Sequence, residues 1–463
     1  MMAEDTSTTG KSATPETAPA WLKLRDAATR LLSADADRAV LQRDAMTAFA
    51  VRCVSAGLLY ATQIAMARWM GQTEYGIYVF LWTCVLLISG LCHLGMNLGI
   101  IRLIALHREA GDMERLRGVI SGGRIFALAM GTLAALTGWT VLTLLGTKVS
   151  PSYHDAAMLA LVCVPLYAMT DIQDGIGRGN RWIATALLPP YVLRPLLLLA
   201  ALTAAWATGA QMVATTAAIA AIVATWVTAL VQAWFINRHT VAAYGRGTKR
   251  YEPRQWLAAS LPMLAISGCE ILLQNTDVLV LSRFTSPADV AVYFAAGKTM
   301  ALIMFVHYAV GSATASRFAS LKARGDEAGL REAVREAVRW TFGPSLAAAI
   351  TILALGKPLL SLFGPAFVEG YPVMGILVFG YLARSAMGPA EFLLNMLGQQ
   401  KRCAMSMMTA AALGIALNLA LVPLYGITGA AVATATALAT AALLNAHMAR
   451  VHLGLDVAIW RNL

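Results

Sequence analysis

Four basic residues lie well inside long apolar stretches of the sequence: Arg52, Arg194, Lys298 and Arg384. A charge at bilayer depth costs at least about 2.5 kcal/mol, so such a residue usually faces the interior of a helix bundle or a wet cavity. Basic groups in such a cavity suit an anionic head group, such as a lipid diphosphate sugar. All four residues are therefore predicted to bind substrate, and Arg52 and Lys298 are proposed for a central cleft.

Several of these cations also have another interpretation. Arg52 lies near the inner third of its apolar stretch, where it would equally reach the membrane interface by snorkelling. Arg384 and Glu391 are seven residues apart on one helix face, which favours an ion pair between them. Arg194 stands among three prolines, and this predicts a broken helix that lines a cavity.

A row of polar groups follows one face of another apolar stretch. Glu270, Gln274 and Asp277 are spaced i, i+4 and i+7, so two acids and an amide share that face. One interpretation is a coupling site for H⁺ or Na⁺. The other is a pair with a basic residue such as Lys298, which would itself form part of a gate. Glu391 is also predicted to act in coupling or gating.

The remaining polar groups favour structural roles. Asp171 and Asp174 close an apolar stretch near the inner surface, where solvated acids at a helix end are expected. His93 and His307 each lie within an apolar stretch and are interpreted as satisfied hydrogen-bonding groups. No Cys/His cluster is present, so neither a metal site nor a bound cofactor is predicted apart from the coupling ion.

Membrane helices must position these residues. Of 463 residues, 58% are apolar and only 13% are charged, and the mean hydropathy is +0.63. A soluble domain is nearer half apolar and a quarter charged, so almost any soluble enzyme of this length is excluded. A membrane span needs about 20 mostly apolar residues. The sequence predicts about twelve such transmembrane helices in an all-α integral membrane protein, beginning near Thr47, Gly76, Val119, Ala156, Ile183, Gln211, Leu257, Val290, Thr341, Val373, Cys403 and Ile427.

The net charge of +11 is explained by topology. Most of the 36 Lys and Arg residues fall in the N-terminal segment and in the loops on one side of the predicted membrane. The positive-inside rule therefore places both termini in the cytoplasm. No nucleic-acid partner is needed to explain the charge.

The chain repeats itself once, with two blocks at nearly the same offset of 214 or 215 residues. The matched residues are Arg68, Glu74 and Tyr78 with Arg283, Asp289 and Tyr293, and Gly111, Asp112, Leu116 and Arg117 with Gly325, Asp326, Leu330 and Arg331. Six spans fit in this offset. An even number of spans gives two bundles of the same orientation, as in parallel-repeat transporters.

This repeat predicts how the chain is divided. The predicted parts are a cytoplasmic tail with an amphipathic helix (1–44), a six-helix bundle (45–240), a cytoplasmic linker (241–256), a second six-helix bundle (257–450) and a cytoplasmic tail (451–463). The outer loops are too short for a catalytic domain, which argues against a membrane glycan polymerase. No Gly-rich phosphate loop with Lys-Ser/Thr is present, so the chain carries no ATP motor of its own. The function classes that remain are secondary transport and the flipping of a lipid.

Three stretches resemble a known family. Asn275–Phe284 followed by Val290–Ala296 is similar to its "D…L…VG-x-Y-x-x-A" passage, and Glu74–Tyr78 is the counterpart in the first half. Pro423–Ala431 is similar to the "P-x-x-G-x-x-G-A-A" turn that enters the last span. The family usually has Gly where this chain has Ala291. The chain thus resembles the polysaccharide-transporter (Wzx-type) flippases of the multidrug/oligosaccharidyl-lipid/polysaccharide exporter superfamily, whose fold is MATE/MurJ-like.

The resemblance implies a substrate and a place. Such a protein moves undecaprenyl-diphosphate-linked oligosaccharide across the bacterial inner membrane by alternating access, for a surface polysaccharide such as lipopolysaccharide or exopolysaccharide. A lateral gate beside the first and seventh spans is expected from the fold. The implied partners are membrane lipid, a polysaccharide polymerase and a chain-length regulator. An ion-coupled drug or metabolite antiporter of the same superfamily is the alternative function.

Overall fold

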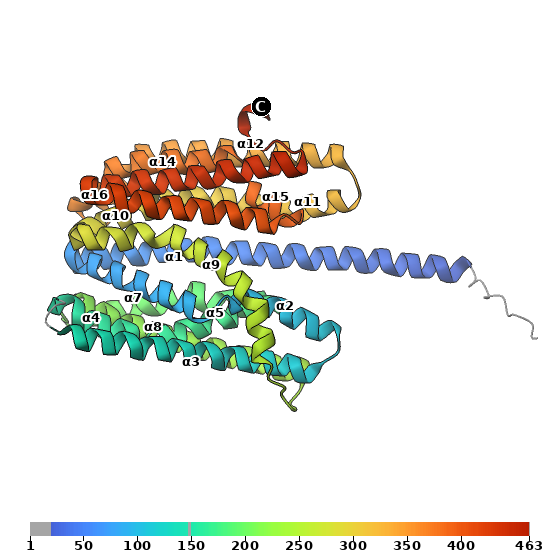
Figure 1. Cartoon of the computed structure of the whole chain (residues 1–463), viewed down its shortest axis with the longest axis horizontal. Coiled ribbons are helices and arrows are strands. Elements are labelled where there is room, and N and C mark those ends of the chain that lie inside the picture. The colour runs from blue at the N-terminus through green and yellow to red at the C-terminus, as the bar shows by residue number, and fades with distance from the viewer. Residues whose placement is uncertain (1–19, 147–149, 463) are drawn as a thin grey trace, which may run out of the picture. The chain divides into compact units, whose positions relative to one another are not determined.

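The computed structural model describes residues 20–146 and 150–462, without the side chains of residues 20–46, 48–49, 265–266 and 316. Every regular element in this part of the chain is a helix, which confirms the predicted all-α fold (Figure 1). The longer elements are α1 (Ala20–Cys92), α2 (Met96–Glu109), α3 (Met113–Leu145), α4 (Pro151–Leu161), α5 (Val164–Gly179), α6 (Ile183–Leu188), α7 (Arg194–Ala207), α8 (Ala214–Tyr244), α9 (Pro253–Phe284), α10 (Pro287–Met300), α11 (Met304–Ala323), α12 (Glu327–Ala354), α13 (Gly356–Ser361), α14 (Tyr371–Ala386), α15 (Ala390–Met396) and α16 (Gln400–Leu453). Short helical turns are Pro189–Leu193, Ala301–Ile303, Pro365–Gly370 and Ile459–Arg461.

The chain divides into two units, Met1–Met46 and Thr47–Leu463. Helix α1 begins at Ala20, in the first unit. The predicted amphipathic face falls among residues whose side chains lie outside the described part of the chain. The bundle and linker boundaries at residues 240, 256 and 450 stay predictions.

The helices are suited to cross a membrane several times. In the described residues, eight helices are long and apolar enough to do so, or ten if each of two bent pairs forms one span. The bent pairs are α4 with α5, and the two parts of α9, each bent by 44°. By length and composition the count is therefore eight to ten, and the number twelve stays a prediction.

Two of these apolar stretches are far longer than one span. Ala50–Glu109 holds 60 residues and Gln400–Leu453 holds 54, whereas a span needs about 20. Each contains a glycine with non-helical backbone, Gly71 (φ 75°) and Gly426 (φ 55°), in the left-handed region that glycine tolerates. Across Gly71, the hydroxyl of Tyr75 donates to Oε1 of Gln63 at 2.7 Å, a distance that a straight helix would not allow. The chain therefore folds back at Gly71.

The predicted break near Arg194 is a turn of π-helix. This turn covers Pro189–Leu193, and Arg194 is the first residue of α7. Proline cannot donate a backbone hydrogen bond, and such wide turns inside helices are frequent at functional sites. Helices α6 and α7 still form a single candidate span, Ile183–Ala207.

Within the unit Thr47–Leu463 the helices form two groups. The helices from α2 through α8 contact one another and form one group, and the helices from α10 through α16 form the other. Helix α9 contacts both α2 and α16. Figure 1 shows α9 passing from one group to the other. Helix α1 packs on the first group, where the hydroxyl of Ser89 donates to the carbonyl oxygen of Val164 at 3.3 Å, and it meets the second group at one end. There the hydroxyls of Tyr60 and Thr299 are 3.0 Å apart, and Nε of Arg68 donates to the carbonyl oxygen of Leu362 at 2.6 Å. This end is called the sealed end below.

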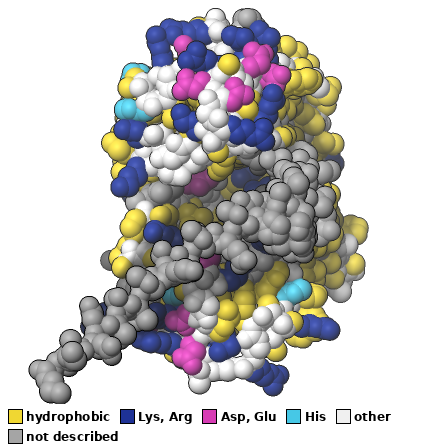
Figure 2. All heavy atoms as spheres, turned by 90° about the vertical axis from the view of Figure 1, so that its right-hand side faces the viewer, with side chains coloured by type: hydrophobic (Ala, Val, Ile, Leu, Met, Phe, Trp, Pro, Cys, Tyr) yellow, Lys and Arg dark blue, Asp and Glu magenta, His cyan; other side chains and the backbone are white. Residues whose placement is uncertain are grey.

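The outside of the helices is apolar. Leu144, Leu424 and Phe379 are 81%, 74% and 73% exposed, and a large apolar surface of this kind suits lipid better than water. Figure 2 shows the face that carries the α2–α3 and α11–α12 connections, where Lys and Arg side chains gather over both helix groups. The molecule is a multi-pass membrane protein.

The internal repeat is visible in the backbone. Asp112 and Asp326 each precede a helix, α3 and α12, with the same φ of −82° and ψ of 83°. The carboxylate of Asp112 accepts a hydrogen bond from the backbone N–H of Arg115, and Asp326 accepts one from Gly329. Both are helix N-caps, a role that aspartate favours because it satisfies a free N–H of the first turn.

Replacing either cap with alanine should destabilise the start of its helix by about 1 kcal/mol. We expect Asp112→Ala to raise amide hydrogen exchange at the start of α3 only, and Asp326→Ala to do so at the start of α12 only. Asp→Asn variants keep the acceptor and are the controls. Equal exchange in the Asn and Ala variants would contradict the capping role.

Candidate functional site

Two of the predicted substrate cations rest on aromatic rings. The guanidinium carbon of Arg52 lies 5.4 Å from the ring centre of Tyr191, and Nζ of Lys298 lies 4.8 Å from that of Phe294. Both side chains are exposed, and neither takes part in an ion pair among the described residues. A cation–π contact holds a charge in place without neutralising it. Both charges are therefore available to an anion.

Arg194 has the same kind of support. Its guanidinium carbon lies 4.6 Å from the ring centre of Tyr167 and 6.0 Å from that of Trp82. The two rings are themselves in edge-to-face contact, with centres 5.9 Å apart. Arg194 is half-buried and forms no ion pair with any residue that the structure describes. The sequence pointed to this residue through its prolines, but the two rings come from other helices.

Arg52 lies within electrostatic range of both helix groups. It acts on Asp174 of α5 and on Glu270 of α9. An arginine that only snorkelled to the lipid interface would not act electrostatically on acids of two other helices. This position favours the prediction that Arg52 faces the space between the groups.

The predicted pair of Arg384 and Glu391 is formed. Nη2 of Arg384 lies 2.6 Å from Oε2 of Glu391, and both side chains are 17% exposed. The two residues do not share a helix face as expected, because α14 ends at Ala386 and α15 begins at Ala390. The ion pair bridges this helix break. The charge of Arg384 is therefore paired with a carboxylate. The other three predicted cations form no ion pair among the described residues.

The predicted polar row separates into two environments. Glu270 and Gln274 are exposed, and Nε2 of Gln274 donates to Oε1 of Glu270 at 3.4 Å. Asp277 is half-buried and accepts hydrogen bonds from the hydroxyls of Tyr293 at 2.6 Å and Thr434 at 3.2 Å. The sequence did not point to these two partners.

The proposed pair of Asp277 and Lys298 is not among the ion pairs of the described residues. Lys298 does influence Asp277 electrostatically, but its ammonium lies over Phe294 instead. The carboxylate of Asp277 instead accepts hydrogen bonds from the hydroxyls of Tyr293 and Thr434 and from the backbone N–H of Val278.

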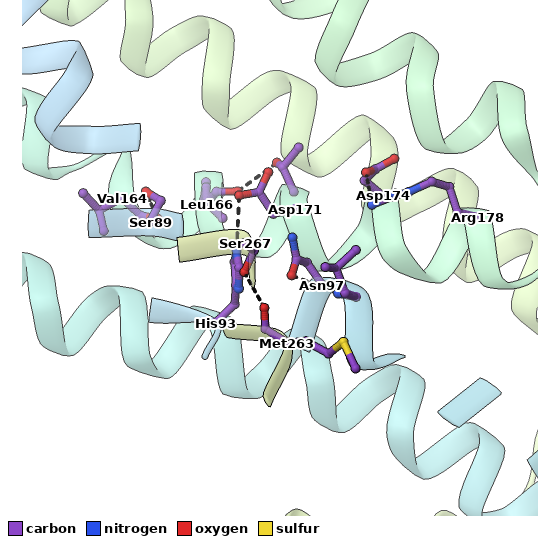
Figure 3. Close-up of polar contacts among 12 residues, drawn as sticks. Ser89, His93, Asn97, Val164, Leu166, Asp171, Asp174, Arg178, Met263 and Ser267 are labelled. Carbon is purple, nitrogen blue, oxygen red and sulfur yellow. Dashed lines mark hydrogen bonds and ion pairs between the residues drawn. The ribbon is translucent and has the colours of Figure 1, made fainter. Parts of the chain in front are cut away.

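Two expectations for the other polar groups are wrong. Asp174 is not a solvated acid: it is 14% exposed, and its Oδ2 lies 2.7 Å from Nη2 of Arg178. Nor do the described residues satisfy the histidines by hydrogen bonds, because Nδ1 of His93 and both ring nitrogens of His307 are buried without a partner among them. Figure 3 shows His93 beside Asp171 of α5, with Nε2 to Oδ2 at 3.7 Å.

In the described residues, no group of three His, Cys, Asp or Glu side chains is arranged to hold a metal ion. The charged groups described above are instead spread over α1, α5, α7, α9, α10, α14 and α15.

Known proteins define the class of this molecule. The family model described as polysaccharide biosynthesis protein matches residues 41–321, and the model described as MatE matches residues 262–445. These families hold transporters and flippases, not enzymes. The fold and these matches define a membrane transporter or flippase. Because the first match covers more than half of the chain, the protein belongs to the polysaccharide biosynthesis protein family.

Solved structures show the same fold. An inward-facing multidrug resistance MATE family transporter of the MOP superfamily superposes with a TM-score of 0.68 at 15% identity, covering 88% of this chain and 94% of that one. The lipid II flippase MurJ, in an inward closed conformation, gives 0.68 at 13% identity and 88% coverage of both chains. A MOP superfamily transporter from Pyrococcus furiosus gives 0.61 at 16% identity, covering 90% and 95%. No protein with a curated function matches the chain in sequence.

Proposed function

We propose that the protein moves an anionic, lipid-linked oligosaccharide across the bacterial inner membrane by alternating access. The substrate class is undecaprenyl-diphosphate-linked repeat units, which are used for surface or exopolysaccharide. One observation carries this proposal: Arg52, Arg194 and Lys298 are held on aromatic rings and form no ion pair with a carboxylate among the described residues. Membership of the polysaccharide biosynthesis protein family and the likeness to a lipid II flippase support it.

The physical demand on such a protein is to carry a polar, doubly charged group through a medium of low dielectric constant. A diphosphate that leaves water loses its hydration, and fixed basic groups replace part of it. Cations that already had carboxylate partners would have to exchange them first. Cations supported by rings keep their full charge for the incoming phosphates, while the lipid tail stays in the bilayer.

The orientation proposed for the chain has both termini in the cytoplasm. The face with the α2–α3 and α11–α12 connections is rich in Lys and Arg (Figure 2), as cytoplasmic faces are. The sealed end then faces outward. Glu270, Gln274, Asp277 and Glu391 are proposed for coupling to H⁺ or Na⁺ or for gating. A polymerase and a chain-length regulator are the proposed protein partners.

An ion-coupled drug or metabolite antiporter is the second candidate. The match of residues 262–445 to the MatE model favours it, because this half carries the exposed acid Glu270 beside the exposed amide of Gln274. A deletion strain separates the two functions. Loss of a surface polysaccharide, with lipid-linked repeat units accumulating inside the cell, is the result expected for the flippase. Altered drug susceptibility with intact polysaccharide would support the antiporter instead.

Arg52→Ala and Lys298→Ala should each lower complementation of that strain about tenfold or more at normal protein levels. The reason is that a hydrogen bond to a charged group contributes about 1.5–3 kcal/mol. Arg238→Ala is the matched control, because Arg238 also stacks on a ring, that of Trp234 at 5.6 Å, but near the end of α8. Full complementation by both site variants would remove these residues from the mechanism.

A further inference from the structure

The two helix groups each contain one buried histidine at corresponding places of the repeat. His307 follows His93 by 214 residues, the same offset that separates the helix caps Asp112 and Asp326. Both histidines are 1% exposed. Each has its Nε2 close to a carboxylate oxygen, at 3.7 Å from Asp171 for His93 and at 3.5 Å from Glu391 for His307. The sequence repeat did not reveal this pair, because the residues around the two histidines differ.

The surroundings of His307 leave room for a small ligand. Among the residues that the structure describes, no hydrogen-bond partner lies beside either ring nitrogen of His307 or beside Oδ1 of Asn445. Both residues line a cavity of about 20 Å³ together with Arg384 and Glu391. A cavity of about 10–15 Å³ holds one water molecule when polar groups surround it. The cavity therefore has room for one water molecule beside the imidazole.

The surroundings of His93 are similar in character. Its ring lies at the end of α1 and faces Asp171 of α5, while its Nδ1 is buried without a partner. Figure 3 shows Ser267 of α9 nearby, but the hydroxyl of Ser267 donates to the carbonyl oxygen of Met263 at 3.1 Å. A buried imidazole with an unused nitrogen costs free energy that a purely structural residue would avoid.

The carboxylates do not repeat, although the histidines do. At the offset of 214 residues, Asp171 corresponds to Ser385, and Glu391 corresponds to Gly177. The two carboxylates therefore stand at positions that do not correspond to each other in the repeat. A histidine–carboxylate pair is therefore not a simple consequence of the repeated sequence, and this argues for a role of the pair itself.

We propose that His93 and His307 are proton-binding sites of the transport cycle, one in each helix group. This inference rests on the proposed transport function and names its coupling ion. In each site the neutral imidazole takes a proton from a hydronium ion: an O–H bond breaks and leaves water, a new N–H bond forms, and the residue becomes an imidazolium. The proton returns to water at the other side of the membrane, so no other reactant is consumed.

Proton uptake changes the contacts inside each group. An imidazolium facing a carboxylate forms a charge-assisted hydrogen bond of about 2.7–2.9 Å, shorter than the present 3.7 and 3.5 Å. Protonation of His93 would draw the end of α1 toward α5. Protonation of His307 would draw α11 toward α15, at the break that the pair of Arg384 and Glu391 bridges. Both movements tighten a helix group from within.

Other charged groups act on these sites. Around His307 they are Glu391 of α15 and Arg384 of α14, with Glu270 of α9 acting on both of these. The helix α12 also packs on α11, and its ion pair of Glu336 with Arg317 lies toward the other end of α11.

Around His93, the facing acid is Asp171 of α5, on which Arg194 of α7 acts. The next charged pair on α5 is Asp174 with Arg178. Both histidines thus face an acid that a nearby arginine also influences.

Infrared difference spectra test the sites directly. The full-length protein is labelled with ¹³C-histidine, reconstituted in lipid, and compared between pH 8 and pH 5. Each titrating histidine adds imidazolium signal, so His93→Gln and His307→Gln should each lose the signal of one of the seven histidines. His154→Gln is the matched control, because His154 is a half-buried histidine outside both proposed sites. No loss in the two site variants would overturn the proposal.

Two further variants distinguish the loss of a proton-binding site from misfolding of the protein. Asp171→Asn and Glu391→Gln keep the histidines but remove the facing charge, so the imidazolium signal should move to lower pH. An unchanged titration in both would contradict the proposal. Elution as a single species in size-exclusion chromatography shows that each variant is folded.

Transport gives the second measurement. Proteoliposomes receive a fluorescent polyprenyl-diphosphate-linked N-acetylglucosamine, with a pH gradient or a Na⁺ gradient imposed. The pH gradient should speed transport by wild type about tenfold, a usual size for coupling between sites. The His93→Gln/His307→Gln variant should keep downhill exchange and lose this stimulation. Stimulation by Na⁺ alone would overturn proton coupling. If wild type moves no probe in any gradient, the proposed function fails, and the infrared result alone decides the proton sites.

Discussion

Replacing Glu391 with alanine should lower the free energy of unfolding by about 3–5 kcal/mol, because it leaves the half-buried guanidinium of Arg384 without its partner. Nη2 of Arg384 lies 2.6 Å from the removed carboxylate, and both side chains are only 17% exposed. The variant also removes the acid that faces His307 at 3.5 Å. In a chain of 463 residues, a loss of this size should reduce the midpoint of thermal unfolding by about 3–5 °C, measured on the purified protein in lipid nanodiscs.

A matched ion pair on the surface provides the control. Nη1 of Arg335 lies 3.0 Å from Oε2 of Glu332, but these side chains are 47% and 53% exposed. Removing such a pair should cost about 1 kcal/mol or less, so Glu332→Ala should shift the midpoint little. The double variant Arg384→Met/Glu391→Leu replaces the pair with apolar groups and should recover much of the loss. A double variant as unstable as Glu391→Ala would show that the unpaired charge is not the cause.

Much of the helical architecture could be predicted from the sequence, because lipid imposes length and composition on each span. The repeat was also visible, since the helix caps Asp112 and Asp326 perform the same local task at each helix start. Local signals of this kind survive in one sequence. The number of spans was harder to predict, because helices bend or fold back at residues such as Gly71 without an intervening polar loop.

The site could be predicted only in part. The cost of burying charge pointed to Arg52, Arg194 and Lys298. The rings that support Arg52 and Arg194 come from segments distant in the sequence, and the ring that supports Lys298 comes from the preceding turn of its own helix. The sequence pattern alone does not single out these rings. The partner of Arg384 was predicted correctly, although the helix break between the two residues was not.

The histidines show the limit of reasoning from one residue at a time. A single buried histidine is ordinary, and nothing in the sequence near His93 or His307 marks it. Their significance comes from the acids that other helices place beside them. Tertiary contacts, not periodicity, decide what a buried polar group does.

Replacing Gly76 with alanine should open the sealed end of the protein. A Cβ on Gly76 would overlap the carbonyl oxygen of Pro287, the first residue of α10, so backbone must move. Next to it, Tyr75 is fully buried and packs edge-to-face on Phe294 and Phe367, with ring centres 6.4 and 6.1 Å away. Overpacking of such a contact costs about 1–3 kcal/mol, and this cost applies only while the sealed end is closed.

The population of the open form should therefore rise about five- to hundredfold, since about 1.4 kcal/mol corresponds to a factor of ten. Spin labels attached to the side chains introduced by Ala210→Cys and Ala366→Cys report the population of the open form. Both positions are exposed, and both adjoin contacts of the sealed end, because the N–H of Ala214 donates to Glu74 and Phe367 packs on Tyr75. The exposed Cys53 is replaced by serine so that it takes no label.

In the Gly76→Ala variant, the distance between the labels should gain a longer component in pulsed electron resonance spectra. Gly57→Ala is the matched control, because a Cβ at this helical glycine meets no atom within 4 Å. The same substitution there adds a methyl group without forcing the two helix groups apart, so its label distances should match those of wild type. Equal distances in both variants would mean that the close approach of Gly76 to Pro287 does not hold the sealed end closed, and that the hydrogen bonds from Arg68 and Tyr60 are sufficient.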